Sequence, residues 1–412
     1  MKRIFFCLIS VLMFVSCSDE IPQEQPGYSH DRTMLAYIMA NETRLDDELK
    51  QNIVDMYAGL TAYGKAANLL VYYRPSMRYE EVFQEPTLMK FVSDGKGKVN
   101  GKPALSGDDL NLIEIYKQAD KVFYNQYQNS ASPRVMAEVL KEMVRQSPAA
   151  SYGLTLGSHG SGWLPGYAAD SRSFGQDGDY TINIPELADV LREVFDGNKL
   201  DFLLFDACMM ANAEVFYELR DVTKYCVASV IETSVLGFPY DKLMPELYQE
   251  KVNYQKICDE FVELNRRRDL WGVLSAVDCS KMQPIADWVK QGLADADGAF
   301  AGDFYQTVQQ YGRGIYTNYS FDLADFFRQL YGHEPAELLK LTEQAVVAMN
   351  GMFNMNRPGY PPMVDKARFC GIGMYIPYYP EKTKENINMN WDRYYESSIE
   401  WSKVVGWSRY RP

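Results

Sequence analysis

Residues 200–210 read Leu-Asp-Phe-Leu-Leu-Phe-Asp-Ala-Cys-Met-Met. The apolar run Leu200 to Phe205 has the length and composition of a strand that is buried on both faces. After it, Met209, Ala213, Phe216 and Tyr217 share one helical face, which predicts a helix that begins at Cys208. A buried strand that runs into a helix is typical of parallel α/β sheets, whose chemistry lies beyond the carboxyl ends of the strands.

The same alternation continues on both sides of this segment and predicts an α/β fold, a mostly parallel central sheet flanked by helices. After residue 240 the sequence becomes helix-rich and aromatic, with the strand at 271–277 and one later predicted strand at 369–376. A late aromatic cluster there either packs in a core or forms a carbohydrate platform. We expect strands at 34–40, 68–73, 152–156, 222–231, 271–277 and 369–376, helices at 46–60, 133–143 and 185–195, and the aromatic cluster at Trp391, Tyr394, Tyr395, Trp401 and Trp407.

The composition is that of a globular protein with an acidic surface. Among 412 residues, 47% are hydrophobic and 24% are charged, which excludes a disordered or fibrous chain. The formal net charge of −13 argues against nucleic-acid binding, which needs a basic surface, but is compatible with a cationic substrate.

The N-terminus has the features of an export signal. Lys2 and Arg3 precede an apolar run, 4–15, that is shorter than the ~20 residues needed to span a bilayer. Ser16 and Cys17 follow and resemble a bacterial lipoprotein box, and the acidic residues after them resemble the surface-export tag of Bacteroidetes lipoproteins. We therefore expect a signal peptide over 1–16, a lipidated Cys17 and a tether over 17–30. The protein would be an exported outer-membrane lipoprotein, exposed at the cell surface and attached to the membrane by its lipid alone. The alternative is a secreted protein with an incidental cysteine.

The five cysteines after Cys17 give neither a disulfide framework nor a zinc site. Their number is odd and no CxxC spacing occurs, so at least one thiol stays unpaired in an exported protein. These cysteines are Cys208, Cys226, Cys258, Cys279 and Cys370.

One of three histidines is well placed for chemistry. His30 falls in the tether and His333 in a polar turn, whereas His159 directly follows a predicted buried strand. It lies in Gly157-Ser158-His159-Gly160-Ser161-Gly162-Trp163, where glycines let the backbone approach a ligand. Cys208 lies 49 residues after His159, which leaves room for one crossover helix. If the two strands are adjacent and parallel, both side chains lie at the same edge of the sheet. A helix N-terminus at Cys208 would lower the pKa of its thiol. The alternative is a structural histidine and an inert buried cysteine.

The GSHGSGW and FDACMM motifs resemble the two signature motifs of the clostripain family of cysteine peptidases, relatives of caspases, gingipains and legumains. Further segments of the chain are similar to the family, so the resemblance covers about residues 31–330. It implies a caspase-like fold with a catalytic core over 31–240, completed by the C-terminal region 241–412. The segments are 34–38, 214–219, 227–240 and 321–326.

The resemblance implies a Cys–His dyad. Cys208 would attack the scissile carbonyl, and His159 would protonate the departing amine and later activate water. Backbone amides of Gly160 and Cys208 would hold the oxyanion. Asp206 matches the acid of a pocket for Arg or Lys before the cleaved bond, although an N-cap aspartate is the alternative. The stretch 234–236 lacks an acid that some relatives carry.

Two further expectations concern the loop between His159 and Cys208. Family members often process themselves there, and Arg172 is the one basic residue over 168–179; a plain surface turn is the alternative. Some relatives need calcium, and Asp170, Asp177 and Asp179 are candidate ligands, but their spacing is not that of an EF-hand, so no metal or cofactor is assigned.

We therefore expect a monomeric cysteine endopeptidase that acts on proteins or peptides after basic residues and does not bind nucleic acid. Two alternatives stay open: a catalytically silent binding lipoprotein with the peptidase fold, and a transpeptidase that uses the same thioester chemistry.

Overall fold

A computed structural model of the chain describes most residues from His30 to Tyr410. The described ranges are 30–41, 45–76, 82–165, 173–296, 306–312, 320–356, 359, 363–377 and 386–410. Among these residues, no helix is long and apolar enough to cross a membrane. The predicted signal peptide, the lipidated Cys17 and most of the tether lie outside the described residues. His30, predicted in the tether, is the first residue of strand β1.

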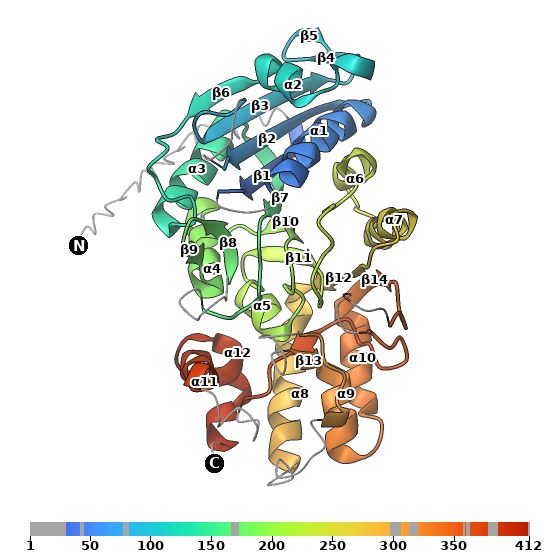
Figure 1. Ribbon diagram of the computed structural model, residues 1–412. Coiled ribbons are helices and arrows are strands. Elements are labelled where there is room, and N and C mark those ends of the chain that lie inside the picture. Colours follow the sequence, from blue (N-terminus) through green and yellow to red (C-terminus); the bar gives the residue numbers. More distant parts are fainter. Residues whose placement is uncertain are drawn as a thin grey trace, which may run out of the picture.

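A mixed eleven-stranded sheet runs through the molecule (Figure 1). The five strands at its centre pair in parallel, in the order β2-β1-β7-β10-β11, and antiparallel strands extend both sides. The full order is β14-β12-β11-β10-β7-β1-β2-β3-β4-β5, with β6 beside β3. The bounds are β1 His30–Met39, β2 Ala66–Arg74, β3 Thr87–Asp94, β4 Lys98–Val99, β5 Lys102–Pro103, β6 Asp120–Phe123, β7 Ala149–Gly157, β10 Leu200–Asp206, β11 Thr223–Ala228, β12 Val273–Asp278 and β14 Val346–Gly351.

Helices cover both faces of this sheet, which is why its central strands are apolar on both sides. In β10, Phe202 and Leu204 join the core under one group of helices, whereas Leu203 and Phe205 join the core under the other. The first group is α1 Asp46–Ala62, α2 Leu112–Gln118, α6 Tyr240–Leu247 and α7 Tyr254–Arg267. The second is α3 Pro133–Gln146, α4 Ile184–Val194, α5 Ala213–Glu218 and α8 Met282–Asp295. The predicted α/β fold, a mostly parallel central sheet flanked by helices, is confirmed, and antiparallel strands extend this parallel centre on both sides.

The region after residue 240 adds β12 and β14 to this sheet and then forms a helical layer in the lower half of Figure 1. The late aromatic side chains are in its core: Trp391, Tyr395, Trp401 and Trp407 are at most 2% exposed, so they do not form a surface platform. The predicted strand at 369–376 shrinks to two residues, β15. The elements are β13 Phe321–Asp322, paired with β15 Gly373–Met374, and α9 Leu323–Tyr331, α10 Ala336–Ala345, α11 Asn386–Ser398, α12 Glu400–Val405 and the 3-10 helix Trp407–Tyr410. His333 lies in the turn between α9 and α10.

Candidate active site

The two motifs meet at one edge of the sheet because their strands are neighbours. β7 and β10 pair in parallel with Asp206 opposite Gly157, which confirms the predicted adjacency. His159 and Cys208 each lie two residues beyond this last pair. The amide of Ser158 donates to the carbonyl of Asp206 at 3.2 Å, so the strands are still joined where the motifs begin. Both side chains therefore start from the same rim of the sheet.

The loops that carry the two side chains are in direct contact. A Cβ placed on Gly160 would lie 2.8 Å from the Cys208 carbonyl oxygen and 3.0 Å from the Ala207 Cβ. Real Cβ contacts shorter than 3.0 Å are essentially absent from proteins, so the contact with the Cys208 carbonyl requires glycine at position 160.

A hairpin fixes the other side of the His159 loop. Strands β8 (Phe174–Asp177) and β9 (Tyr180–Ile182) form it, and Gly160 lies opposite Phe174. The bonds beside this pair run from the Gly175 amide to the His159 carbonyl at 2.8 Å and from the Ser161 amide to the Ser173 carbonyl at 3.1 Å. In this antiparallel pattern the amide of Gly160 itself points away from the hairpin.

Cys208 is the least buried of the described cysteines. It is half-buried, whereas Cys226, Cys258, Cys279 and Cys370 are buried; all five are free. Its Sγ lies 3.5 Å from the Thr233 Oγ1, a contact that the sequence did not reveal. Burial raises the pKa of the Cys208 thiol, against the weaker lowering effect of hydrogen bonds with Thr233.

The predicted lowering of this pKa by a helix N-terminus is therefore wrong. The helix after the cysteine, α5, begins at Ala213, five residues downstream, and Asn212 caps it by accepting the Val215 amide at 3.2 Å. Between strand and helix the chain makes a tight loop in which Met209 has a φ of 59°. Its amide donates to the Ile231 carbonyl at 3.0 Å, which supports this strained conformation.

Asp206 is buried at the same edge, on the α1 side of the sheet. Its carboxylate accepts hydrogen bonds from Asn52 Nδ2 at 2.9 Å and from the Tyr240 hydroxyl at 3.0 Å. Gly237, at a φ of +63°, packs directly over it. Burial raises the pKa of Asp206 to about 7, although the Tyr240 hydrogen bond opposes this. Since α5 starts at Ala213, Asp206 is not a helix N-cap, the alternative considered for it.

Asn52 and Tyr240 were not recognised as partners of this carboxylate from the sequence. Asn52 offered a signal, because it is a polar residue among the apolar positions that α1 turns toward the sheet. Tyr240 offered none, since a tyrosine at a helix start is equally compatible with core packing.

The candidate calcium ligands do not form a site in the described part of the chain. Asp177 is buried and accepts from the Arg74 Nε at 3.0 Å, the Asn41 Nδ2 at 2.6 Å and the Ser130 amide at 2.6 Å. Asp179 lies in the turn between β8 and β9, and Asp170, like Arg172, falls outside the described residues. Within the described ranges, no group of three or more His, Cys, Asp or Glu is placed to hold a metal ion. Asp177 therefore fixes the hairpin beside His159 and does not fit the role of a cation ligand.

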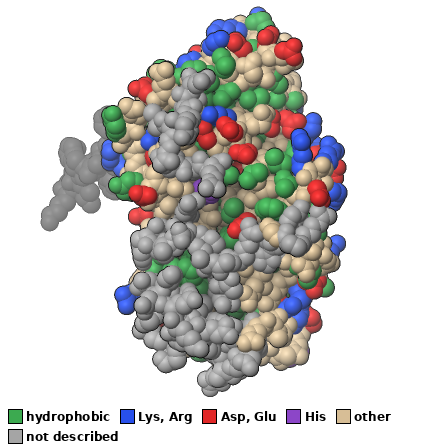
Figure 2. All heavy atoms as spheres, viewed as in Figure 1, with side chains coloured by type: hydrophobic (Ala, Val, Ile, Leu, Met, Phe, Trp, Pro, Cys, Tyr) green, Lys and Arg blue, Asp and Glu red, His purple; other side chains and the backbone are tan. Residues whose placement is uncertain are grey.

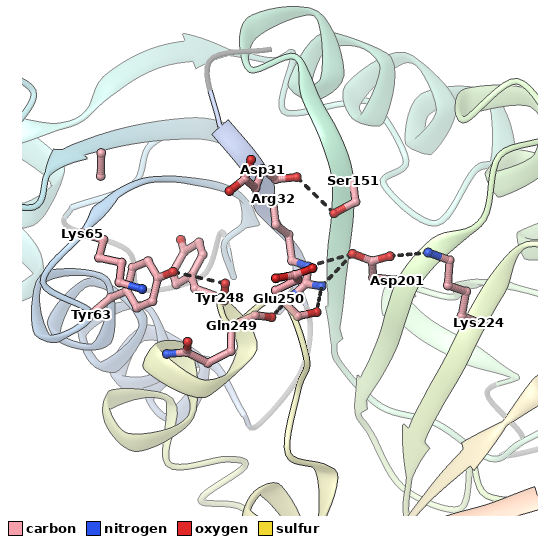
Figure 3. A pocket seen from close by; sticks show the side chains of 11 residues that line it. Asp31, Arg32, Tyr63, Lys65, Ser151, Asp201, Lys224, Tyr248, Gln249 and Glu250 are labelled. Carbon is pink, nitrogen blue, oxygen red and sulfur yellow. Dashed lines mark hydrogen bonds and ion pairs between the residues drawn. The ribbon is translucent and has the colours of Figure 1, made fainter.

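A polar cavity of about 730 Å³ lies at the opposite edge of the sheet, where the parallel strands begin (Figure 3). Arg32 points across it to Asp201 at 2.7 Å and donates to the Leu247 carbonyl at 2.8 Å, and Lys224 approaches Asp201 from the other side. These bonds join the first residues of β1, β10 and β11 to the end of α6. The cavity is therefore a structural junction, remote from His159 and Cys208.

Comparisons with known proteins agree with this architecture. The model of the clostripain family matches residues 36–408. A secreted C11 cysteine protease from Bacteroides thetaiotaomicron, solved with an irreversible peptide inhibitor, is 24% identical and superposes with a TM-score of 0.69 over 92% of this chain and 99% of that one. An inactive zymogen C11 protease from Parabacteroides distasonis is 23% identical, with a TM-score of 0.67 over 91% and 98%. No curated protein matched.

At these identities the two structures establish the fold, which is the predicted caspase-like one, and the family match covers most of the chain. This chain therefore belongs to the clostripain family of cysteine peptidases.

Proposed function

We propose that this endopeptidase uses Cys208 as nucleophile and His159 as general acid and base, and that it cleaves after arginine or lysine. The proposal depends on the pairing of β7 with β10, which places the His159 and Cys208 motifs at the same edge of the sheet. The contact between Gly160 and the Cys208 backbone supports it further. Among the described cysteines, Cys208 is also the one that is not buried.

The raised pKa of Cys208 bears on how the nucleophile is activated. Because the resting group is a thiol, its proton must leave as the sulfur attacks the substrate carbonyl, and His159 is the base proposed to accept it. The same proton then passes to the departing amine, which leaves a thioester on Cys208. A water that gives its proton to His159 hydrolyses this thioester and restores the thiol.

The oxyanion of each tetrahedral intermediate would be held by the amides of Gly160 and Cys208. The support for Gly160 is that its amide points away from the β8 hairpin while its Cα rests on the Cys208 backbone. Amides fixed in this way need no reorganisation when charge develops.

Specificity for basic residues is proposed to come from Asp206. A guanidinium or ammonium group that reached this buried carboxylate would favour its ionised form and gain a charge-assisted hydrogen bond. Since Gly237 covers the carboxylate, the 237 loop would have to move to admit a long side chain. The net charge of −13 also favours cationic substrates. Figure 2 shows Asp and Glu side chains interspersed with Lys and Arg over the described part of the viewed face.

We also propose that the protein is exported as an outer-membrane lipoprotein, anchored through Cys17 and exposed at the cell surface. We further propose that it processes itself after Arg172 and that it is a monomer. The sequence motifs described above support the first two. Mass spectrometry of the N-terminal peptide tests acylation, and comparison of wild type with Arg172→Ala on a denaturing gel tests processing. Elution of a purified acyl-free form as a dimer would contradict the monomer.

The central experiment measures hydrolysis of fluorogenic Arg, Lys and Leu amides by wild type, Cys208→Ala and His159→Ala. Cys258→Ala is the matched control, since it removes a buried thiol remote from the rim. We expect Cys208→Ala and His159→Ala to lose hydrolysis of the Arg and Lys amides, and we expect Cys258→Ala to keep it. Folded wild type that releases no fluorophore, or Cys208→Ala that equals it, would refute the proposal. Product joined to an added amine instead of water would indicate transpeptidation.

A further inference from the structure

Three aromatic rings join the His159 loop to the C-terminal region. Trp163 lies four residues after His159 and is 1% exposed. Its ring centroid is 4.6 Å from that of Tyr375 and 4.8 Å from that of Tyr395, and the two tyrosine rings are 4.9 Å apart. The downstream end of the His159 loop therefore rests on side chains that come from beyond residue 370.

The downstream end of the Cys208 loop reaches the same place. Glu214, in the first turn of α5, accepts the Tyr375 amide and the Tyr395 hydroxyl on one carboxylate oxygen, each at 2.9 Å. Just before it, the Ala211 carbonyl accepts the Gly373 amide at 2.9 Å. Thus one C-terminal segment is bonded to the loop of Cys208 and packed on the loop of His159.

We propose that Glu214 and Tyr395 are positioning residues, which set the distance between His159 and Cys208 by bonding the two loops to one aromatic cluster with Trp163. On the strand side the loops are joined through β7 and β10; on the far side this cluster is the shared support. Neither Glu214 nor Tyr395 would touch substrate. The inference rests on the proposed dyad and assigns to the C-terminal region a part in the reaction.

The use of a carboxylate here points to placement more than to stability. A buried carboxyl group loses hydration, so an apolar residue would stabilise a plain helix contact at least as well. The Glu214 carboxylate accepts directional hydrogen bonds from two donors in separate parts of the C-terminal region. These bonds fix the position of α5 relative to that region, which apolar packing alone would leave adjustable. The second oxygen of Glu214 has no hydrogen-bond partner among the described residues.

The same helix provides a natural comparison. Glu218, one turn after Glu214, is also buried, and its carboxylate accepts the Glu400 amide at the start of α12. Tyr217 donates its hydroxyl to Gln283 at 2.6 Å and packs on Trp401. Both side chains hold the C-terminal region, and neither takes part in the contacts described for Trp163.

The test compares Tyr395→Phe with Tyr217→Phe, each of which removes one hydroxyl at the interface of α5 with its neighbours. Because misplacing reacting groups by ~1 Å costs up to about 100-fold, we expect Tyr395→Phe to lower kcat about tenfold with KM within about twofold, and Tyr217→Phe to leave kcat within about twofold. Alkylation of Cys208 by iodoacetamide should slow in Tyr395→Phe and not in Tyr217→Phe. A merely structural role for Tyr395 would lower the unfolding temperature without these kinetic changes.

A second pair keeps the inference testable if Tyr395→Phe folds poorly. Glu214→Ala and Glu218→Ala are assayed at temperatures equally far below their own unfolding midpoints, and Glu214→Ala should show the lower kcat. Trp163→Phe, which keeps an aromatic ring, should recover much of the activity that Trp163→Ala loses. Equal kcat for Tyr395→Phe and Tyr217→Phe, or for Glu214→Ala and Glu218→Ala, would overturn the positioning role. Failure of the proposed function looks different, because wild type itself would then show no Cys208-dependent hydrolysis.

Discussion

Replacing Gly160 by alanine should separate the His159 loop from the Cys208 loop. The added methyl carbon would lie 2.8 Å from the Cys208 carbonyl oxygen, where ordinary contact begins at 3.4 Å, so the loops must part by 3.4 − 2.8 = 0.6 Å along this line. The Met210 Sδ, also 2.8 Å away, belongs to a flexible side chain, whereas the Cys208 carbonyl belongs to the backbone. Overpacking of this kind costs about 1–3 kcal/mol of stability. Displacement of the dyad should lower kcat by about 10- to 100-fold.

The assay is hydrolysis of a fluorogenic arginine amide, with thermal unfolding measured in parallel. Gly157→Ala is the matched control in the same motif, because its new methyl carbon would sit 3.5 Å from Ile38 Cγ1 and Leu49 Cδ2, at ordinary contact. We expect Gly157→Ala to keep kcat within about twofold of wild type, since the change fits the existing packing. Near-wild-type kcat in Gly160→Ala, or an equal loss in Gly157→Ala, would refute the idea that this contact sets the dyad.

Burial raises the pKa of Asp206 from 3.8 to about 7, so the unfolded chain ionises first and stability falls as pH rises between these values. Asp206→Asn should therefore unfold at a higher temperature than wild type at pH 8, and the difference should be smaller at pH 5. The same variant should lose the preference for Arg over Leu amides. An unchanged preference would show that Asp206 is not part of the specificity pocket. In wild type, kcat/KM for an Arg amide should rise with pH through about 7, and a flat profile in that range would count against pairing with this carboxylate. Asp177→Asn breaks a buried ion pair with Arg74 and should destabilise the fold by about 3–5 kcal/mol, equally with calcium and with a chelator; rescue by calcium would instead make Asp177 a ligand. Arg32→Met should cost about 2 kcal/mol in chemical denaturation and leave kcat unchanged, because the Arg32–Asp201 junction is at the far edge of the sheet; a kcat defect would show that the two edges are coupled.

The local sequence was sufficient to predict the central strands and the edge of the sheet at which the two motifs lie. The run 200–205 is apolar at almost every position, as a strand covered on both faces must be, and the glycine-rich segment after β7 marks where the chain turns away from the sheet. Consecutive strands joined by a helical crossover lie next to each other about two-thirds of the time, which is why the sequence predicts that His159 and Cys208 share one edge of the sheet.

The start of the helix after Cys208 could not be predicted from helical spacing. Met209 lies on the same periodic face as Ala213 and Phe216, but tertiary hydrogen bonds from the Met209 and Ala211 amides to the chain after β11 hold residues 207–212 in a loop. Long-range pairing overrode local periodicity here, and with it the expected effect of a helix N-terminus on the thiol.

The amino-acid sequence alone determined the strand order around the two motifs, the family and the pair of side chains proposed for chemistry, because each depends on patterns within short stretches. Only the tertiary structure decided what surrounds them. Asn52 and Tyr240 at Asp206, Thr233 at Cys208, and the bonding of Glu214 to Tyr375 and Tyr395 join residues up to 181 positions apart. Burial and hydrogen bonding depend on such distant neighbours, and so do the pKa values of Cys208 and Asp206.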